Sequence, residues 1–171
     1  MRRVRFGVAM SLDGYIAGPN GEADWIVMDP DIDFKEIFSR FDTLVMGRGT
    51  FEAMKAMGGG DGTVPGVQVI VISRSMRQAD HPNVTVTDDV KGVIADLRGK
   101  PGKDIWLFGG GLLFRGCLEL GLVDGLDVAI VPVLLGGGIP LLPPPATKAR
   151  LKLTRHRVYE KSGIVALEYD L

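Results

Sequence analysis

The stretch 104–115 constrains the fold of this chain more than any other part of it. Residues 105–108 are four apolar residues in a row, which is typical of a buried strand in a sheet covered on both faces. Three glycines follow without a polar spacer, and a helical pattern begins at once after them. Such a junction presents free backbone N–H groups and a positive helix end to an anion. A tight turn that lets a helix pack close to a sheet explains the same glycines, so both interpretations stay open at this point.

Length and composition indicate one globular domain over residues 1–171. A chain of 171 residues with 46% hydrophobic and 24% charged residues can bury a substantial core without disulfides. The formal net charge of −1 supplies no basic field, so no nucleic-acid partner is expected.

Membrane, metal and disulfide chemistry find no support in the sequence. No apolar run reaches the roughly 18–20 residues that a membrane span needs, so no membrane association and a cytoplasmic location are expected. The single cysteine, Cys117, lies in an apolar helical pattern and is interpreted as a small core residue. Two histidines without Cys/His clustering predict no metal site.

A second junction of strand, glycine and helix lies earlier in the chain. Residues 43–46 form a short apolar strand pattern that leads directly into Gly47-Arg48-Gly49-Thr50, and residues 51–57 have a helical pattern. This junction adds a guanidinium and a hydroxyl to the free backbone donors of a helix start. The chain therefore has two candidate anion-binding turns of the same construction.

The order of the remaining elements predicts a single mixed, mostly parallel sheet flanked by helices. Strand and helix patterns alternate through the body of the chain, which implies parallel strands. Residues 151–159 and 164–171 form a C-terminal antiparallel β-hairpin around Lys161-Ser162-Gly163. The other expected elements are strands at 4–10, 67–72, 84–86 and 127–135 and helices at 34–41, 90–97 and from 112 onward.

Four segments in this order resemble the dihydrofolate reductase-like superfamily, in particular the reductase domain of bacterial riboflavin biosynthesis, the C-terminal domain of RibD. They are residues 10–17 (MSLDGYIA), 45–52 (VMGRGTFE), 108–111 (FGGG) and 131–138 (VPVLLGGG). The resemblance spans nearly the whole chain and implies a three-layer fold with NADPH as the cofactor. No zinc deaminase sequence of the H-x-E and P-C-x-x-C type occurs, so the resemblance concerns the reductase domain alone.

The resemblance places the NADPH phosphates between the two glycine turns. Ser73 and Arg74 end a strand where the family contacts the adenosine ribose phosphate, and a guanidinium there favours NADPH over NADH. The glycines lack the G-x-G-x-x-G spacing of the dinucleotide-binding alternative. The implied cofactor-binding residues are Ala9, Ala17, Gly18, Gly47, Arg48, Gly49, Thr50, Ser73, Arg74, Phe108, Gly109, Gly110, Gly111, Leu112 and Leu113.

The loop 10–18 resembles the family's active-site lid, and the acid that serves the reaction is left open among three carboxylates. Folate-reducing members place an acidic residue in the helix after the lid, where Asp31 and Asp33 lie in this chain. Either aspartate is also a suitable helix N-cap. Asp13 matches the riboflavin-type Ser-Leu-Asp-Gly motif, where substrate binding and fixing of the turn are both open roles.

The expected function is the NADPH-dependent reduction of a planar nitrogen heterocycle, by resemblance the 5-amino-6-(5-phosphoribosylamino)uracil of riboflavin synthesis. The alternatives are a dihydrofolate reductase and an NADPH-binding sensor without turnover. An apolar substrate slot suits such a ring, with Met10, Trp25, Phe34 and Phe38 as its expected walls, although core packing explains an aromatic helix stripe equally. A homodimer is also expected, since riboflavin-type members pair through the region of residues 128–135.

Overall fold

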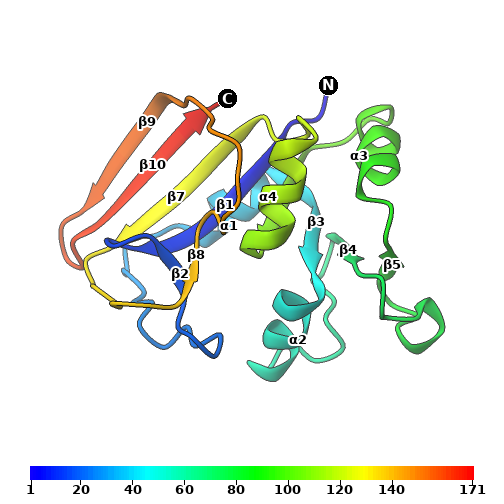
Figure 1. The fold of residues 1–171 in the computed structure, drawn as a ribbon, viewed down its shortest axis with the longest axis horizontal. Coiled ribbons are helices and arrows are strands. Elements are labelled where there is room, and N and C mark those ends of the chain that lie inside the picture. Colours follow the sequence, from blue (N-terminus) through cyan, green and yellow to red (C-terminus); the bar gives the residue numbers. More distant parts are fainter.

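A computed structural model describes residues 1–171 as a three-layer α/β arrangement around an eight-stranded sheet (Figure 1). All neighbouring strands from β5 to β7 run parallel, and β10 and β9 add an antiparallel pair at one edge. In spatial order the strands are β5 (Thr85–Thr87), β4 (Gln68–Ile72), β3 (Phe41–Gly47), β6 (Asp104–Gly109), β1 (Val4–Ser11), β7 (Gly125–Val131), β10 (Ile164–Asp170) and β9 (Lys152–Tyr159).

Helices cover both faces of this sheet. The core residues of α3 and α4 pack against one face, and those of α2 pack against the other, on which α1 also lies. A small second sheet pairs β2 with β8 beside the carboxyl ends of the central strands. The bounds are α1 (Phe34–Ser39), α2 (Arg48–Ala56), α3 (Val90–Arg98), α4 (Gly111–Glu119), a 3₁₀ turn (Gln78–Asp80), β2 (Tyr15–Ala17) and β8 (Ile139–Pro140).

Alternation along the central strands places separate cores on the two faces of the sheet. In β6, Ile105 and Leu107 are buried under α3 and α4, while Trp106 and Phe108 point to the opposite face. On the α4 side, Phe6 stacks on Phe114 with ring centroids 4.1 Å apart. The predicted strand at 105–108 is therefore confirmed as a central strand covered on both faces.

The C-terminal hairpin is confirmed, but the strand expected at 127–135 ends earlier. β7 stops at Val131 because Pro132 has no N–H with which to continue the ladder. After it the Val133 N–H turns back onto the Val131 carbonyl, 2.8 Å away. The helix expected at 51–57 begins at Arg48, so the second glycine junction passes directly from strand into helix.

Cys117 is expected to be unreactive in the folded protein. Its thiol is buried beneath α4 in the larger core, and burial raises its pKa to about 12, which suppresses the reactive thiolate near neutral pH. Titration with Ellman's reagent should therefore label no thiol until urea unfolds the chain, and one thiol afterwards. Rapid labelling of the native protein at pH 7 would contradict this burial.

No helix of the structure has both the length and the apolarity that a transmembrane span requires.

Candidate functional site

The two glycine junctions lie side by side at the carboxyl ends of neighbouring parallel strands. β3 pairs with β6, and Met46 faces Gly109 across the last step of that ladder. α2 starts directly from β3, and α4 starts one residue after β6. Thr50, in the first turn of α2, approaches the glycine turn closely, since a Cβ on Gly109 would lie 3.0 Å from the Thr50 hydroxyl oxygen. The topology thus brings both candidate anion-binding turns together at the carboxyl edge of the sheet, and the region between them is called the crevice below.

Both helix starts in this crevice leave their first backbone N–H groups without a side-chain cap. Gly47 is the N-cap of α2 and Gly110 is the N-cap of α4, and neither glycine can offer a capping oxygen. The other two α-helices are capped in the ordinary way, α1 by Asp33 and α3 by Asp89. Uncapped N–H groups and two helix dipoles therefore point into the crevice, which suits a ligand with several negative charges.

The three glycines at the end of β6, residues 109–111, have different backbone conformations and surroundings. Gly109 has a φ of +147°, which side-chain-bearing residues rarely adopt. Gly111 packs closely, because a Cβ there would lie 2.8 Å from the Pro140 carbonyl oxygen. Gly110 has extended backbone dihedrals and is joined to Gly109 by a cis peptide bond, and its only neighbour within 4 Å of a Cβ would be Thr50, at 3.4 Å. The packing around position 110 therefore leaves room for a Cβ.

Cationic and hydroxyl groups continue the crevice toward the end of β4. The Arg48 guanidinium donates a hydrogen bond to the Ser75 hydroxyl at 2.9 Å, which bridges the start of α2 and the segment after β4. Ser73 accepts hydrogen bonds from the backbone N–H groups of Ser75 and Met76 and so folds this segment into a tight turn. Arg74 lies in the turn, exposed and without an ion-pair partner.

A cavity of about 560 Å³ lies on the α1 side of the sheet, and its lining includes Phe108, the residue before the glycine turn. Small residues form its floor: Gly7, Ala9, Ala129 and Ala166 sit on neighbouring strands and leave the sheet face uncovered. Aromatic and aliphatic side chains form its walls. They include Phe34, Ile37, Phe38, Phe41, Trp106, Val131, Tyr159 and Ile164.

Only some of the residues expected to bind cofactor or substrate line this cavity. Ala9, Phe34, Phe38 and Phe108 line the cavity. Met10 instead packs against the core on the α4 side. Trp25 packs on the small core around Val131, Tyr159 and Ile164, where its ring N–H donates to the Glu22 carbonyl at 3.1 Å. Among the remaining expected cofactor residues, Ala17 pairs with β8 and Gly18 begins the turn that follows. Leu113 packs on the α4-side core, and Leu112 is exposed.

The three candidate acids lie in three different environments. Asp13 accepts hydrogen bonds from the Ser11 hydroxyl and from the backbone N–H groups of Leu135 and Gly136, at 2.6, 3.1 and 2.7 Å. The Ser11 bond and then the Gly136 bond lower the pKa of Asp13, and the carboxylate fastens the turn between β1 and β2 to the segment after β7. This geometry favours the turn-fixing role of Asp13 over substrate binding.

Asp31 and Asp33 differ in whether they line the cavity. Asp31 forms an ion pair with Lys161 at 2.8 Å, whose pKa it raises, and does not line the cavity. Asp33 lines the cavity and at the same time caps α1, accepting from the Glu36 N–H at 2.9 Å. Only Asp33 thus combines the cap with a position at the cavity.

Sequence reasoning missed a charged end of the cavity. Asp127 and Glu168 lie next to each other on β7 and β10, and Arg155 faces Glu168 from β9. Arg40, which follows α1, reaches both carboxylates at 3.5 Å. These residues are far apart in the chain, and only strand register brings them together, so no local pattern could have identified them.

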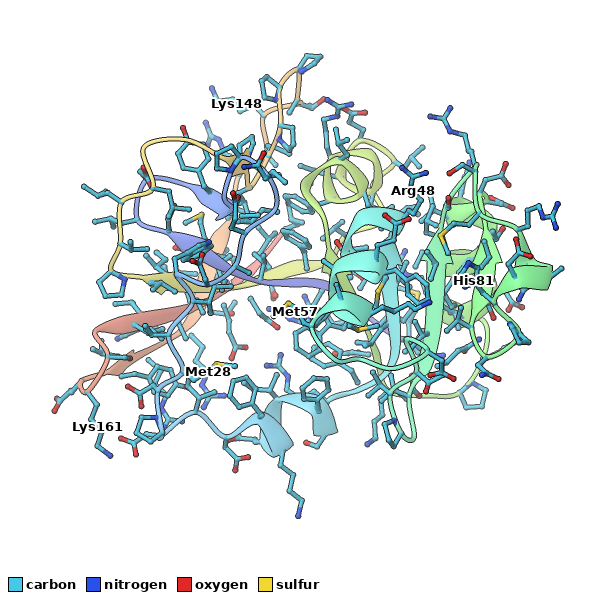
Figure 2. All side chains as sticks on the ribbon, turned by 90° about the horizontal axis from the view of Figure 1, so that it is seen from below. Met28, Arg48, Met57, His81, Lys148 and Lys161 are labelled. Atoms are coloured by element: carbon cyan, nitrogen blue, oxygen red, sulfur yellow. The ribbon has the colours of Figure 1, made fainter.

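A buried aspartate holds the segment that covers the cavity. Ile26, Val27 and Met28 contribute to the lining, and Figure 2 shows Met28 on the same side of the sheet as Lys161 and α1, opposite Lys148. Directly after them Asp29, only 2% exposed, accepts the backbone N–H groups of Asp31 and Ser162, both at 2.9 Å. The covering segment is thereby fastened to the turn of the C-terminal hairpin.

Replacing Asp29 with asparagine is expected to destabilise the protein in a pH-dependent way. The Ser162 contact, together with the Asp31 N–H and Lys161, lowers the pKa of Asp29 below its usual 3.8. A lowered pKa contributes stability that is fully present above the unfolded pKa and lost as pH falls through the folded one. Urea unfolding should therefore show a gap between wild type and Asp29→Asn at pH 7 that narrows below about pH 4, whereas the exposed Asp24→Asn leaves stability unchanged. A gap of constant size across this range would contradict the assignment.

Comparison with known proteins agrees with this architecture. The family model of the RibD C-terminal domain matches residues 2–165. Two proteins of Bacillus subtilis (strain 168), named Uncharacterized protein YyaP and Uncharacterized protein YwjB, are 34% and 28% identical to the chain. The alignments cover 98% and 89% of the chain and 94% and 89% of the relatives.

Three solved structures share the fold. A Shewanella sp. PV-4 protein named "Putative riboflavin biosynthesis protein" is 28% identical, with a TM-score of 0.82 over 99% of this chain and 98% of that one. Dihydrofolate reductase from Enterococcus faecalis, complexed with NADP(H), is 20% identical, with a TM-score of 0.71 over 98% and 95% of the two chains.

The third structure is a longer, two-activity enzyme. It is the diaminohydroxyphosphoribosylaminopyrimidine deaminase/5-amino-6-(5-phosphoribosylamino)uracil reductase of Thermotoga maritima, 18% identical with a TM-score of 0.68. The match covers 99% of this chain and 56% of that enzyme, so this chain spans little more than half of its length. The fold is accordingly dihydrofolate reductase-like, and the chain belongs to the RibD C-terminal domain family.

Proposed function

We propose that this protein is an NADPH-dependent reductase of a small nitrogen heterocycle. One observation carries the proposal: two uncapped helix starts lie together at the carboxyl edge of the sheet, and an apolar cavity of about 560 Å³ extends to Phe108, directly before one of them. A dinucleotide needs the first part for its phosphates, and a planar ring needs the second. Family membership and the reductases among the structural neighbours support the same reaction class.

NADPH fits the residues that are present. The backbone N–H groups at Gly110 and Gly111, together with the start of α2, are free to bind the pyrophosphate. Arg48 and Arg74 supply guanidinium groups for the ribose 2′-phosphate near Ser73, which is the basis for preferring NADPH to NADH. When bound, the cofactor supplies the hydride, and the role of the chain is to hold ring against ring in an apolar cavity that excludes water.

Asp33 is the acid that we assign to the substrate side of the cavity. It is the one carboxylate among the three candidates that lines the cavity. Its hydrogen bond to the Glu36 N–H fixes the carboxylate at the start of α1, beside the aromatic wall of Phe34 and Phe38. A fixed carboxylate in this place can orient a ring N–H or exchange a proton with the ring.

The substrate proposed first is a 5-amino-6-(5-phosphoribosylamino)uracil-like compound, which the Thermotoga maritima neighbour reduces according to its name. Dihydrofolate is the alternative, because the Enterococcus faecalis neighbour is a dihydrofolate reductase. An NADPH sensor without turnover is the alternative outside enzymology, and it uses the same crevice.

Calorimetric titration with NADPH and NADH, followed by a turnover screen of pyrimidines and pterins, tests these proposals. We expect tighter binding of NADPH, a loss of that preference of about tenfold or more in Arg74→Gln or Arg48→Gln, and oxidation of NADPH at 340 nm with one ring class. Binding without turnover across the panel would favour the sensor. If neither nucleotide binds, the reductase proposal is wrong.

A homodimer is a further part of the proposal, and we place its interface on the C-terminal strands and not at residues 128–135, because β7 lies inside the sheet between β1 and β10. Leu153 and Val158 on β9 are 48% and 56% exposed. They pair with Tyr169 and Val165 of β10, and Tyr169 packs toward the α4 side of the sheet. β9 thus carries exposed apolar side chains beyond the area that α4 covers (Figure 1).

Sedimentation tests this interface. At micromolar concentration the wild type should sediment as a dimer and Val158→Asp as a monomer, because a charge cannot be buried between two apolar faces without a partner. Lys91→Asp, an equally exposed change on α3, should remain dimeric. A monomeric wild type at this concentration would exclude the dimer.

A further inference from the structure

The charged end of the cavity is built from one row of the sheet. Gly7, Asp127, Glu168 and Arg155 occupy paired positions on β1, β7, β10 and β9, so their side chains share the cavity face. Gly7 contributes no side chain, and the Trp106 indole lies over it and donates to its carbonyl at 3.1 Å. The row therefore begins at an aromatic wall and ends in charged groups.

Asp127 is fixed rigidly in this row. The Arg5 guanidinium, 4% exposed, donates to its carboxylate through Nε at 3.0 Å to both oxygens and through Nη2 at 2.5 Å. Arg5 also bonds Asp170 and the Tyr169 carbonyl. Asp127 thus keeps its orientation, with Arg40 as its neighbour on the side of α1, 3.5 Å away.

Glu168 and Arg40 keep hydrogen-bonding capacity for a ligand. The nearest partners of Glu168 on this face are Arg40 at 3.5 Å and Arg155 at 3.7 Å, both longer than a normal charged hydrogen bond. Arg40 places the same nitrogen, Nη2, 3.5 Å from Asp127 and 3.5 Å from Glu168. An acceptor, a donor and a second acceptor are therefore arranged in sequence at the end of an apolar cavity.

We propose that Asp127, Arg40 and Glu168 together select the substrate by reading a ring edge with the order donor, acceptor, donor. A cyclic ureide edge, N–H, C=O, N–H, has this order. The carboxylates accept from its two N–H groups, and the Arg40 guanidinium donates to its carbonyl. This inference rests on the proposed function, because it assigns the specificity of the same cavity.

Polar groups of this kind discriminate strongly between a ligand that pairs with them and a ligand that leaves them unpaired. A site built to hydrogen-bond a substrate N–H rejects an analogue that lacks it, because the carboxylate then remains desolvated without a partner. A hydrogen bond to a charged group corresponds to about a tenfold to hundredfold effect on binding. Methylation of both ring nitrogens should therefore be poorly tolerated.

Calorimetric titration with 5,6-diaminouracil and its 1,3-dimethyl derivative, in the absence of cofactor, tests the proposal. The wild type should bind the dimethyl compound at least about tenfold more weakly. Glu168→Gln, which removes one charged acceptor from a residue with no short hydrogen bond to lose, should reduce this ratio to about threefold or less. Glu160→Gln, on the exposed turn of the same hairpin, should keep the wild-type ratio.

Equal affinity of the wild type for the two compounds, or no binding of either, would overturn the proposed recognition by Asp127, Arg40 and Glu168. This outcome needs no variant. A full discrimination ratio in Glu168→Gln with an unchanged unfolding midpoint would overturn the role of Glu168. NADPH binding is measured separately, so the two proposals fail in different ways. If the protein distinguishes the two uracils but does not bind NADPH, the recognition by Asp127, Arg40 and Glu168 is kept and the reductase proposal is excluded. If it binds NADPH but does not distinguish the two uracils, the reductase proposal is kept and this recognition is excluded.

Discussion

Replacing Gly110 with valine is expected to weaken NADPH binding at least a hundredfold while the fold remains intact. If the backbone at this turn approaches the pyrophosphate, an isopropyl group in the same space removes two or more charge-assisted hydrogen bonds. Each such bond is worth about 1.5–3 kcal/mol, so their joint loss exceeds two decades of affinity. Titration of the purified variant with NADPH measures the effect directly.

Gly110 is the informative glycine because it has neither a positive φ nor a close packing contact that a side chain would disturb. Its φ is −104°, and a Cβ would meet only the Thr50 hydroxyl, at 3.4 Å. Gly109 needs its positive φ and Gly111 its close contact with Pro140, so changes there confuse loss of folding with loss of binding. Position 110 separates the two effects.

Gly116→Val is the matched control for this experiment. Gly116 lies in the same helix, and no atom outside that helix would touch a Cβ there. This control should bind NADPH like the wild type. Near-normal NADPH affinity in Gly110→Val, with an unchanged thermal unfolding curve, would show that the turn after β6 serves helix packing and not phosphate binding.

The order of elements could be predicted from the sequence because its signals are local. Apolar runs followed at once by glycine mark the ends of β3 and β6, and the hairpin follows from alternation around Lys161-Ser162-Gly163. The expected strand at 127–135 was too long because its apolar residues continue past Pro132, whereas the backbone ladder does not. The proline itself is the local signal for the earlier end of the strand.

The site could be predicted only where it is made of contiguous residues. Both glycine junctions were found, since each is one continuous motif. Phe34 and Phe38 lie one helical turn apart and share the cavity wall, but nothing local predicts that Met10 turns to the opposite face or that Trp25 packs behind the wall residues Val131, Tyr159 and Ile164. The charged row needs four strands in register, and register is a property of the folded sheet.

Replacing Arg5 with methionine is expected to cost about 3–5 kcal/mol of folding free energy, because it leaves the Asp127 carboxylate without its buried partner. Although burial alone would lower the pKa of Arg5, hydrogen bonding to Asp127 and Asp170 raises it above the ordinary value, which shows that the carboxylates outweigh desolvation. Methionine fills a similar volume, so the expected loss comes from the charge and not from a cavity. Urea unfolding followed by tryptophan fluorescence measures it.

Arg155→Met is the control, since it removes an equal charge from the same face of the sheet. Arg155 is 60% exposed and lies 3.7 Å from Glu168, and exposed pairs contribute less than about 1 kcal/mol. If Arg5→Met costs no more than this control, Asp127 does not depend on Arg5 for its charge. If the large loss appears, Arg5 holds Asp127 in its place in the charged row. Residues of β1, β7 and β10, which come from both ends of the chain, then determine one wall of the cavity.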